Sequence, residues 1–213
     1  STNSRACILS KVVFCALCGH VCSRKVRKSQ TFVWCCRTHL QSAALCPLKP
    51  VSETEIQQAF LSVYNKLQAN QSYILQPIID TLLQLRFLQE QANSARQTAR
   101  DDVQRLAKQR HNLTRIHTLG YIDNAQFLER SIALDQQLRE KKKFLSKRTT
   151  DNSFERVLFQ TRSIQQQLGS SPPLETFDGT IFTKLVNRVQ VSPTTIEFKF
   201  MNGMTLSEKR SSL

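Results

Sequence analysis

Seven cysteines lie between Cys7 and Cys46, and none follows in the rest of the 213-residue chain. Cys15 and Cys18 form a CxxC pair followed by Gly19, a residue type that tolerates the backbone conformation of a tight turn. Two thiolates at this spacing can hold one tetrahedral ion from a single turn, and four thiolates are common ligands of structural zinc. The spacing therefore predicts a zinc site, with Cys15 and Cys18 as two of its ligands.

The second pair of ligands is less regular than the first. Cys36 and Cys46 lie far enough downstream to complete the site, but Cys35 is adjacent to Cys36, and His39 follows at a spacing that also allows coordination. We predict Cys36 and Cys46, and Cys35 and His39 stay open as alternatives to Cys36. Every one of these sets closes the coordination sphere, so the zinc would be structural. The odd number of cysteines and the lack of a secretory signal argue against disulfides.

The positive charge of the chain is concentrated around these cysteines. The net charge is +14, and residues 1–50 carry eight Lys or Arg and no Asp or Glu, whereas residues 51–213 carry 22 basic and 16 acidic residues. Such a surface favours a polyanionic partner. Four cations follow one another in a segment, residues 23–29, that we expect to be an exposed hairpin loop, and one more lies downstream: Arg24, Lys25, Arg27, Lys28 and Arg37. The alternative is that this run is only a solvated face.

The elements that would position the cysteines follow from local patterns. Residues 11–14 and 31–34 have the β-branched and aromatic character of strands that lead into cysteine knuckles, which is typical of a zinc ribbon. After Pro50, Ser52 and Glu55 form a capping box that begins an amphipathic helix. An interruption at residues 70–72 precedes a second helix, whose first turn we expect to contain Pro77.

From residue 88 the apolar stripe becomes narrow and continues without Gly or Pro to about residue 117. A second such stretch follows the short link at residues 119–124, which predicts a long antiparallel coiled-coil arm with a first leg of roughly 45 Å. A helical bundle folded back on residues 55–88 is the alternative. Leu119, Tyr121 and Ile122 are apolar residues at the tip of the arm. They could dock a partner or cap the seam of the coiled coil.

The end of the chain changes character again. We expect a helix over residues 154–168, a short helix capped by Asp178, and strands at 188–191, 195–200 and 204–206 with a hairpin turn at Asn202-Gly203. Residues 207–213 are expected to fray. The predicted class is α+β, divided into a zinc β-ribbon (1–50), a helical connector (51–88), the coiled-coil arm (89–150), and a return helix with C-terminal strands that pack back on the ribbon domain (151–213).

Known catalytic patterns are missing from the sequence. We find no nucleophile in a recognisable setting, no glycine-rich phosphate loop and no metalloprotease motif, so we assign no catalytic residue and expect no enzymatic activity of this fragment. No apolar run approaches the twenty residues of a membrane-spanning helix. We therefore expect a soluble, cytoplasmic protein.

The order of these motifs resembles the C-terminal region of large serine recombinases, which include phage integrases and the recombinases of conjugative transposons. The resemblance rests on Cys15-x-x-Cys18-Gly19, on Trp34-x-Cys36-Arg37-Thr38-His39, on Cys46-Pro47, on the long coiled coil, and on the closing residues 185–203. It covers nearly the whole chain. The catalytic serine domain and the recombinase domain of that family have no counterpart in this sequence.

The resemblance implies a function. In that family a zinc ribbon binds attachment-site DNA, and a coiled coil lets subunits engage each other during synapsis and governs directionality. Carried onto this chain, Cys15, Cys18, Cys36 and Cys46 would bind zinc, the five cations would face double-stranded DNA, and the tip residues would contact another subunit. A directionality factor is a further implied partner, and the source would be bacterial or phage-encoded. The competing hypothesis is a zinc-ribbon coiled-coil adaptor that binds protein instead of DNA.

Overall fold

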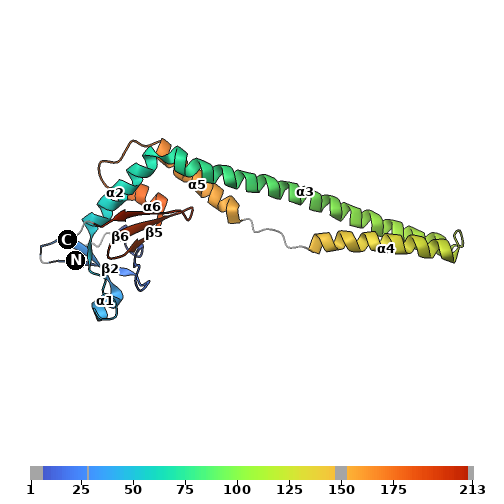
Figure 1. Cartoon of the computed structure of the whole chain (residues 1–213), viewed down its shortest axis with the longest axis horizontal. Coiled ribbons are helices and arrows are strands. Elements are labelled where there is room, and N and C mark those ends of the chain that lie inside the picture. Colours follow the sequence, from blue (N-terminus) through green and yellow to red (C-terminus); the bar gives the residue numbers. More distant parts are fainter. Residues whose placement is uncertain (1–6, 28, 147–152, 211–213) are drawn as a thin grey trace, which may run out of the picture. The chain divides into compact units, whose positions relative to one another are not determined.

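The computed structural model describes residues 7–27, 29–146 and 153–210 (Figure 1). The chain divides into two compact units, one formed by residues 1–81 together with 155–213 and the other by residues 82–154. The first unit is discontinuous in sequence, because its two segments flank the second unit.

Two sheets organise the first unit. One sheet has the strand order β1-β5-β6-β7, with β1 (Val13–Cys15) parallel to β5 (Val186–Val191), and with β6 (Thr195–Phe200) antiparallel to both β5 and β7 (Thr205–Lys209). The other sheet contains β2 (Cys22–Val26), β3 (Phe32–Cys36) and β4 (Val51–Ser52) in antiparallel order. The C-terminal strands therefore complete a sheet that the ribbon begins, as the sequence predicted.

Helix α2 (Glu53–Ala69) supplies the centre of the core of this unit. Ser52 caps it by accepting a hydrogen bond from the Glu55 amide, at 3.0 Å, as the capping box predicted. The ring centroid of Phe60 lies 5.1 Å from that of Phe182 and 5.9 Å from that of Phe198. The buried residues of α2 recur at three and four residues: Ile56, Ala59, Phe60, Val63, Tyr64 and Leu67. The apolar stripe of α2 thus joins the connector segment to the C-terminal sheet.

Three further helices, together with the first turns of α3 (Gln71–Thr118), belong to this unit. The three helices are α1 (Arg37–Gln41), α5 (Ser153–Gly169) and α6 (Gly179–Leu185). Asp178 caps α6 by accepting hydrogen bonds from the amides of Thr180 and Ile181, as predicted.

Three local predictions were wrong. Residues 22–26 are a strand and not a loop, because this segment pairs residue by residue with β3. Strand β7 and Arg210 are ordered where fraying was expected, since Arg210 donates from Nε to Glu55 Oε1 at 3.0 Å and from Nη1 to the Ser192 carbonyl. Pro77 lies inside α3 (Gln71–Thr118) and not in its first turn, since α3 begins at Gln71.

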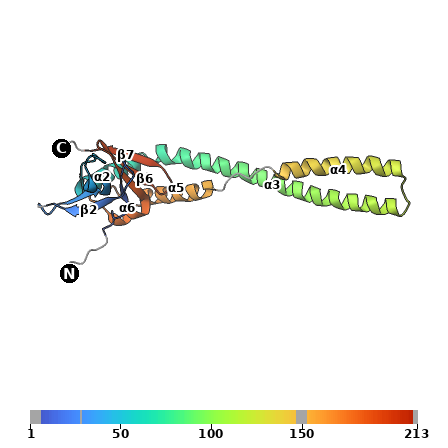
Figure 2. The ribbon, with the colours of Figure 1, turned by 90° about the horizontal axis from the view of Figure 1, so that it is seen from below.

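The second unit is an antiparallel helical hairpin, in which the later part of α3 runs beside α4 (Asn124–Ser146) (Figure 2). Its seam is narrow: the buried residues are Ala99, Leu106 and Leu113 of α3 and Leu138 of α4. Two ion pairs cross it, Arg110 to Asp135 at 3.0 Å and Lys141 to Asp102 at 2.8 Å.

The turn between the two helices is closed by hydrogen bonds of the Schellman type. The Gly120 amide donates to the His117 carbonyl at 2.9 Å, and the Tyr121 amide donates to the Ile116 carbonyl at 3.0 Å. Gly120 has a φ of 77°, which glycine adopts without strain. The His117 ring also stacks on Phe127, with ring centroids 4.2 Å apart. The tip of the hairpin therefore has a defined backbone conformation.

Candidate metal centre and basic strand

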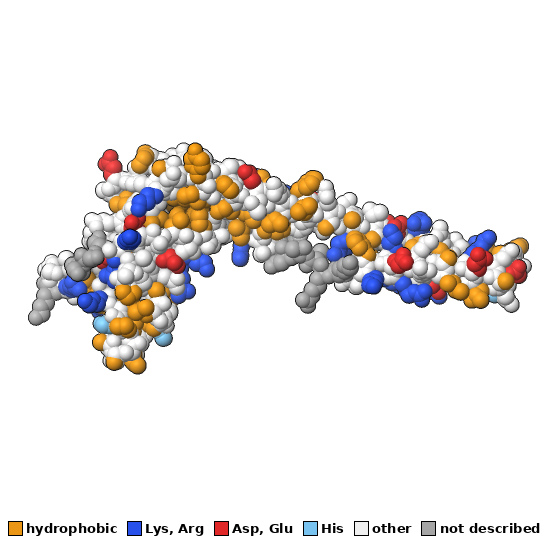
Figure 3. Space-filling model, viewed as in Figure 1, with side chains coloured by type: hydrophobic (Ala, Val, Ile, Leu, Met, Phe, Trp, Pro, Cys, Tyr) orange, Lys and Arg blue, Asp and Glu red, His pale blue; other side chains and the backbone are white. Residues whose placement is uncertain are grey.

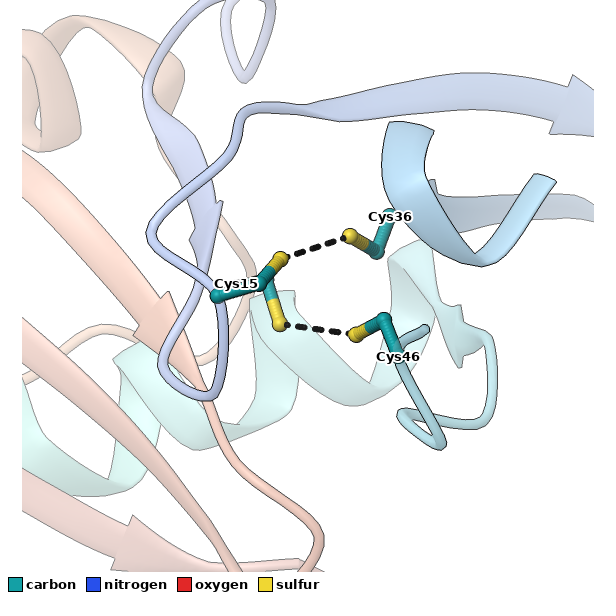
Figure 4. A group of neighbouring side chains, drawn as sticks. Cys15, Cys36 and Cys46 are labelled. Atoms are coloured by element: carbon teal, nitrogen blue, oxygen red, sulfur yellow. Dashed lines mark hydrogen bonds between the residues drawn. The ribbon is translucent and has the colours of Figure 1, made fainter. Parts of the chain in front are cut away.

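Four thiols converge at one end of the ribbon. The sulfur atoms of Cys15, Cys18, Cys36 and Cys46 all lie within 4.8 Å of one another. Two of the separations are 3.5 Å, between Cys15 and Cys46, and 3.3 Å, between Cys18 and Cys36 (Figure 4). These distances exceed the roughly 2.05 Å of a disulfide bond. They are close to the edge of a tetrahedron built from metal–sulfur bonds of about 2.3 Å, which is about 3.8 Å.

Short-range backbone contacts place the first two thiols. β1 ends at Cys15, and the chain then turns so that the Gly19 amide donates to the Cys15 carbonyl and the Cys15 amide donates to the His20 carbonyl, each at 2.9 Å. Gly19 has a φ of 75°, the conformation for which the sequence favoured a glycine. The turn brings Cys18 back beside Cys15, because its hydrogen bonds close the chain on itself.

The other two thiols come from the end of β3 and from the segment after α1. Cys36 is the last residue of β3 and immediately precedes α1, and Cys46 lies five residues beyond its end. The Thr38 hydroxyl lies 3.6 Å from the Cys18 sulfur, so it can orient that thiolate. His39 donates from Nδ1 to the Cys46 carbonyl at 2.7 Å, which ties the segment that carries Cys46 to α1.

Cys35 and His39, the two alternatives to Cys36 as a ligand, lie outside the thiol cluster. Side chains alternate across a strand, so Cys35 points to the face opposite Cys36, where it pairs in register with Ser23. The Nδ1 atom of His39 is occupied by the backbone, and His39 is not part of the thiol cluster. Two other cysteines lie outside the cluster: Cys22 is buried in the core, and the Cys7 thiol lies 3.8 Å from Glu53.

The surroundings of the cluster shift the pKa values of Cys15 and Cys18 in opposite directions. Burial raises the pKa of the Cys15 thiol to about 12. Burial also acts on Cys18, but hydrogen bonds from the His20 backbone and from Thr38 outweigh it and lower the pKa of that thiol to about 5. Metal binding requires the thiolate form of each ligand. A divalent cation would stabilise the thiolates that burial disfavours, so the donor set fits a structural metal ion.

Most of the predicted basic loop is a strand, so its cations alternate between the two faces of the β2–β3 hairpin. Arg24 donates from Nε and Nη2 to the two carboxylate oxygens of Glu53, at 2.7 and 2.8 Å, and its guanidinium lies 3.5 Å from the ring centroid of Phe32. Trp34 also donates to Glu53, at 3.2 Å. Arg24 therefore joins β2 and β3 to the first residue of α2.

Lys25 and Arg27 are exposed and lie near Cys35, on the opposite face of the β2–β3 hairpin. Burial raises the pKa of the Cys35 thiol, and the charges of Arg27 and Lys25, which the strand alternation places on the same face, oppose that rise. Arg37 is also exposed and donates from Nε to Ser23, the neighbour of Cys35 across the strands. These three cations form one surface, which we call the basic strand face. The fourth predicted loop cation, Lys28, lies outside the described residues.

At the tip of the hairpin, Leu119 and Tyr121 are 62% and 78% exposed, whereas Ile122 is half-buried. Two of the three predicted contact residues thus face solvent.

Residues 8–65 match the family model of the recombinase zinc beta ribbon domain. This segment is similar to the zinc ribbons of recombinases. This match includes all four clustered cysteines and most of the helix that the Arg24–Glu53 pair joins to them, and it bears out the resemblance to a recombinase zinc ribbon for this part of the chain.

No curated protein is significantly similar in sequence. A solved structure described as a "Crystal Structure of a LSR-DNA Complex" is similar at 13% identity with a TM-score of 0.37. The similarity covers 94% of this chain and 58% of that one, so this chain spans less than two thirds of the length of that protein. Among the described residues, no helix is long and apolar enough to cross a membrane.

Sequence reasoning missed two residues that hold the first unit together. Glu53 was read only as part of a helix start, although it binds Arg24 and Trp34 from two different strands. Arg210 was expected to fray, although it links the end of the chain to Glu55 and to the Pro50 carbonyl. No local pattern signals either contact, because each joins residues that are far apart in sequence.

Proposed function

We propose that this chain is the DNA-binding and subunit-bridging part of a serine site-specific recombinase, acting in synapsis and not in strand cleavage. The observation that carries the proposal is the recombinase zinc ribbon match at residues 8–65, in a segment that combines four converging thiols with an exposed basic strand face. In this proposal the four cysteines hold one structural Zn²⁺, and the basic strand face contacts duplex DNA.

The division of the cations supports this assignment. Lys25 and Arg27 lie on one face of the β2–β3 hairpin, and Arg37, the first residue of α1, donates to Ser23 on that face. A two-stranded β-ribbon is narrow enough to enter the major groove of DNA, and the hairpin is two-stranded beyond the residues of β3 that pair with β4, Val33 and Trp34. Arg24 lies on the other face, where Glu53 already neutralises its charge. We therefore assign phosphate contacts to Lys25, Arg27 and Arg37, and we assign to Arg24 a role in holding the ribbon together. Lys28 remains a candidate from sequence.

The test is the salt dependence of binding to an attachment-site duplex. Each lost phosphate contact should lower the slope of log affinity against log salt by about 0.9. We expect K25Q/R27Q to lower the slope by up to about 1.8 on that basis. The matched control is R162Q/K184Q, which removes one exposed Arg and one exposed Lys from α5 and α6. Equal slopes for the two variants would exclude the basic strand face as the DNA-binding surface.

Subunit bridging is assigned to the tip of the hairpin. Leu119 and Tyr121 are exposed on a closed turn, so a partner would meet them in a fixed conformation and would not have to order them. We expect L119S/Y121S to weaken self-association of the full chain on DNA, as measured by analytical ultracentrifugation. Binding of a single chain to DNA should be unchanged. Undiminished self-association in this variant would remove the tip from the proposal.

A protein-binding adaptor is the second candidate function. Leu17, Leu40 and Leu45 are 49%, 47% and 69% exposed and belong to the segments that carry the clustered cysteines. If K25Q/R27Q and wild type bind DNA equally weakly, and L17S/L45S abolishes capture of a protein partner, the adaptor replaces the DNA-binding function.

A further inference from the structure

The helical hairpin carries an excess of positive charge on one of its two faces. A helix turns by about 100° per residue, so positions can be assigned to sides of the seam marked by Leu106 and Leu138. Arg100 and Arg110 lie on one side of α3, and Asp102 and Arg105 lie on the other. The same count places Arg139, Lys142 and Lys143 on one side of α4, and Lys141 on the other.

The ion pairs show which sides of the two helices share a face. Arg110 pairs with Asp135, so the side of α3 that carries Arg100 faces the same way as the side of α4 that carries Arg139 and Lys142. On the other face, Lys141 and Arg105 both pair with Asp102. Among the described residues, Asp102 therefore binds two cations on this face, whereas on the opposite face Asp135 binds Arg110 and the four other cations named above have no ion pair.

We infer that this unmatched face, which we call the cationic hairpin face, is a second contact surface for the phosphate backbone of duplex DNA. Its central residues are Arg100, Arg139, Lys142 and Lys143. Within the described part of the hairpin, Asp135 is the acid on this face, and Arg110 already occupies it at 3.0 Å. The four cations have no acidic partner among the described residues. Figure 3 shows Lys and Arg side chains along α4 on the visible side.

The shape of the face favours the backbone of a duplex. A groove between the helices contains Val103, Ala107, Thr114 and Leu138, with Arg110 and Lys142 also lining it. These uncharged and mostly short side chains let a polyanion approach without meeting acid. His111 is the remaining lining residue, and no Phe, Tyr or Trp lines this groove, whereas binding of single strands depends on aromatic side chains that stack on bases. The cations recur over successive helical turns, which suits the regular phosphates of DNA better than one acidic side chain.

The inference adds a contact to the DNA-binding function proposed above and rests on it only in taking duplex DNA as the partner. The test uses the full zinc-loaded chain, a random-sequence duplex and the salt dependence of affinity. We expect R100Q/R139Q/K142Q to lower the slope of log affinity against log salt by up to about 2.7, which is about 0.9 for each of three contacts. Circular dichroism at 222 nm verifies that the hairpin remains folded.

The matched control is R115Q/R130Q/K108Q. It also removes two Arg and one Lys, all exposed and all from the hairpin, but the same helical count places these residues away from the cationic hairpin face. We expect this control to lower the slope of log affinity against log salt by less than the roughly 0.9 of one phosphate contact. If both triple variants lower the slope equally, only net charge matters and the inference is overturned. If neither variant lowers the slope, the inference is also overturned. An unchanged DNA slope with lost binding to polyglutamate would assign the face to an acidic protein instead.

The two proposals fail separately. If R100Q/R139Q/K142Q lowers the slope and K25Q/R27Q does not, the basic strand face is wrong and the cationic hairpin face stands. If only K25Q/R27Q lowers it, the reverse holds.

Discussion

The two units of the chain are held together by different means. In the first unit, side chains from strands and helices distant in sequence meet around Phe60, and four thiols converge beside them. In the second unit, two helices meet along a narrow seam of buried residues, supported by ion pairs across it. If the four thiols hold the proposed ion, the first unit depends on it, whereas a helical hairpin depends on many small contacts. The two units should therefore respond differently to the same perturbation.

The largest difference is expected from loss of the metal. C36S removes one thiolate from the four-thiolate cluster, and structural zinc contributes roughly 10–16 kcal/mol of apparent binding free energy to small zinc domains. We expect loss of stoichiometric zinc and of the near-ultraviolet circular dichroism of Trp34, with the helical signal of α3 and α4 retained. C35S is the matched control, because Cys35 is adjacent but points to the opposite face. Zinc retained in C36S but lost in C35S would reverse the ligand assignment.

A smaller effect on the free energy of unfolding should distinguish Arg24 from Lys25, which lie on opposite faces of the β2–β3 hairpin. R24A leaves the Glu53 carboxylate, which is 15% exposed, without its bidentate partner. Hydrogen bonds to charged groups contribute about 1.5–3 kcal/mol, and the partial exposure of Arg24 places the expected loss of unfolding free energy near the lower end, about 1.5–2 kcal/mol. K25A should change the free energy of unfolding by less than about 0.5 kcal/mol. Urea denaturation followed by Trp34 fluorescence measures both. Equal stability losses would contradict the assigned roles.

The smallest effect concerns the hairpin and depends on pH. Arg105, and next Lys141, lower the pKa of the Asp102 carboxyl below its usual value. Its stabilising contribution is therefore present above the unfolded-state pKa, near 4, and is lost as pH falls through the lower folded-state pKa. Thermal melts at 222 nm should show wild type losing slightly more stability than D102N on acidification below pH 4, and salt should reduce the difference. D101N is the control, since no ion pair is described for Asp101.

The sequence predicted the parts that depend on neighbouring residues. The CxxC pair with Gly19, the capping box at Ser52 and Glu55, and the Asn202-Gly203 turn all lie where local geometry required them. The prediction of a loop at residues 23–29 was wrong for the part that forms β2, because a run rich in charged residues lacks the apolar alternation that signals a strand. Its strand state comes from pairing with β3 and from the Arg24–Glu53 contact. The cationic hairpin face was also missed, because it depends on the register between two helices.

The parallel pairing of β1 with β5 has a consequence for synthesis of the protein. Val13 lies opposite Val189, so 176 further residues must be translated after Val13 before its partner is complete. At roughly 5–20 residues per second, the ribosome needs about ten to thirty-five seconds to produce the partner of β1. The helical hairpin consists of local contacts and can form during that interval. The cysteine knuckle that follows β1 must then either wait for the C-terminal strands or acquire its ion on the nascent chain.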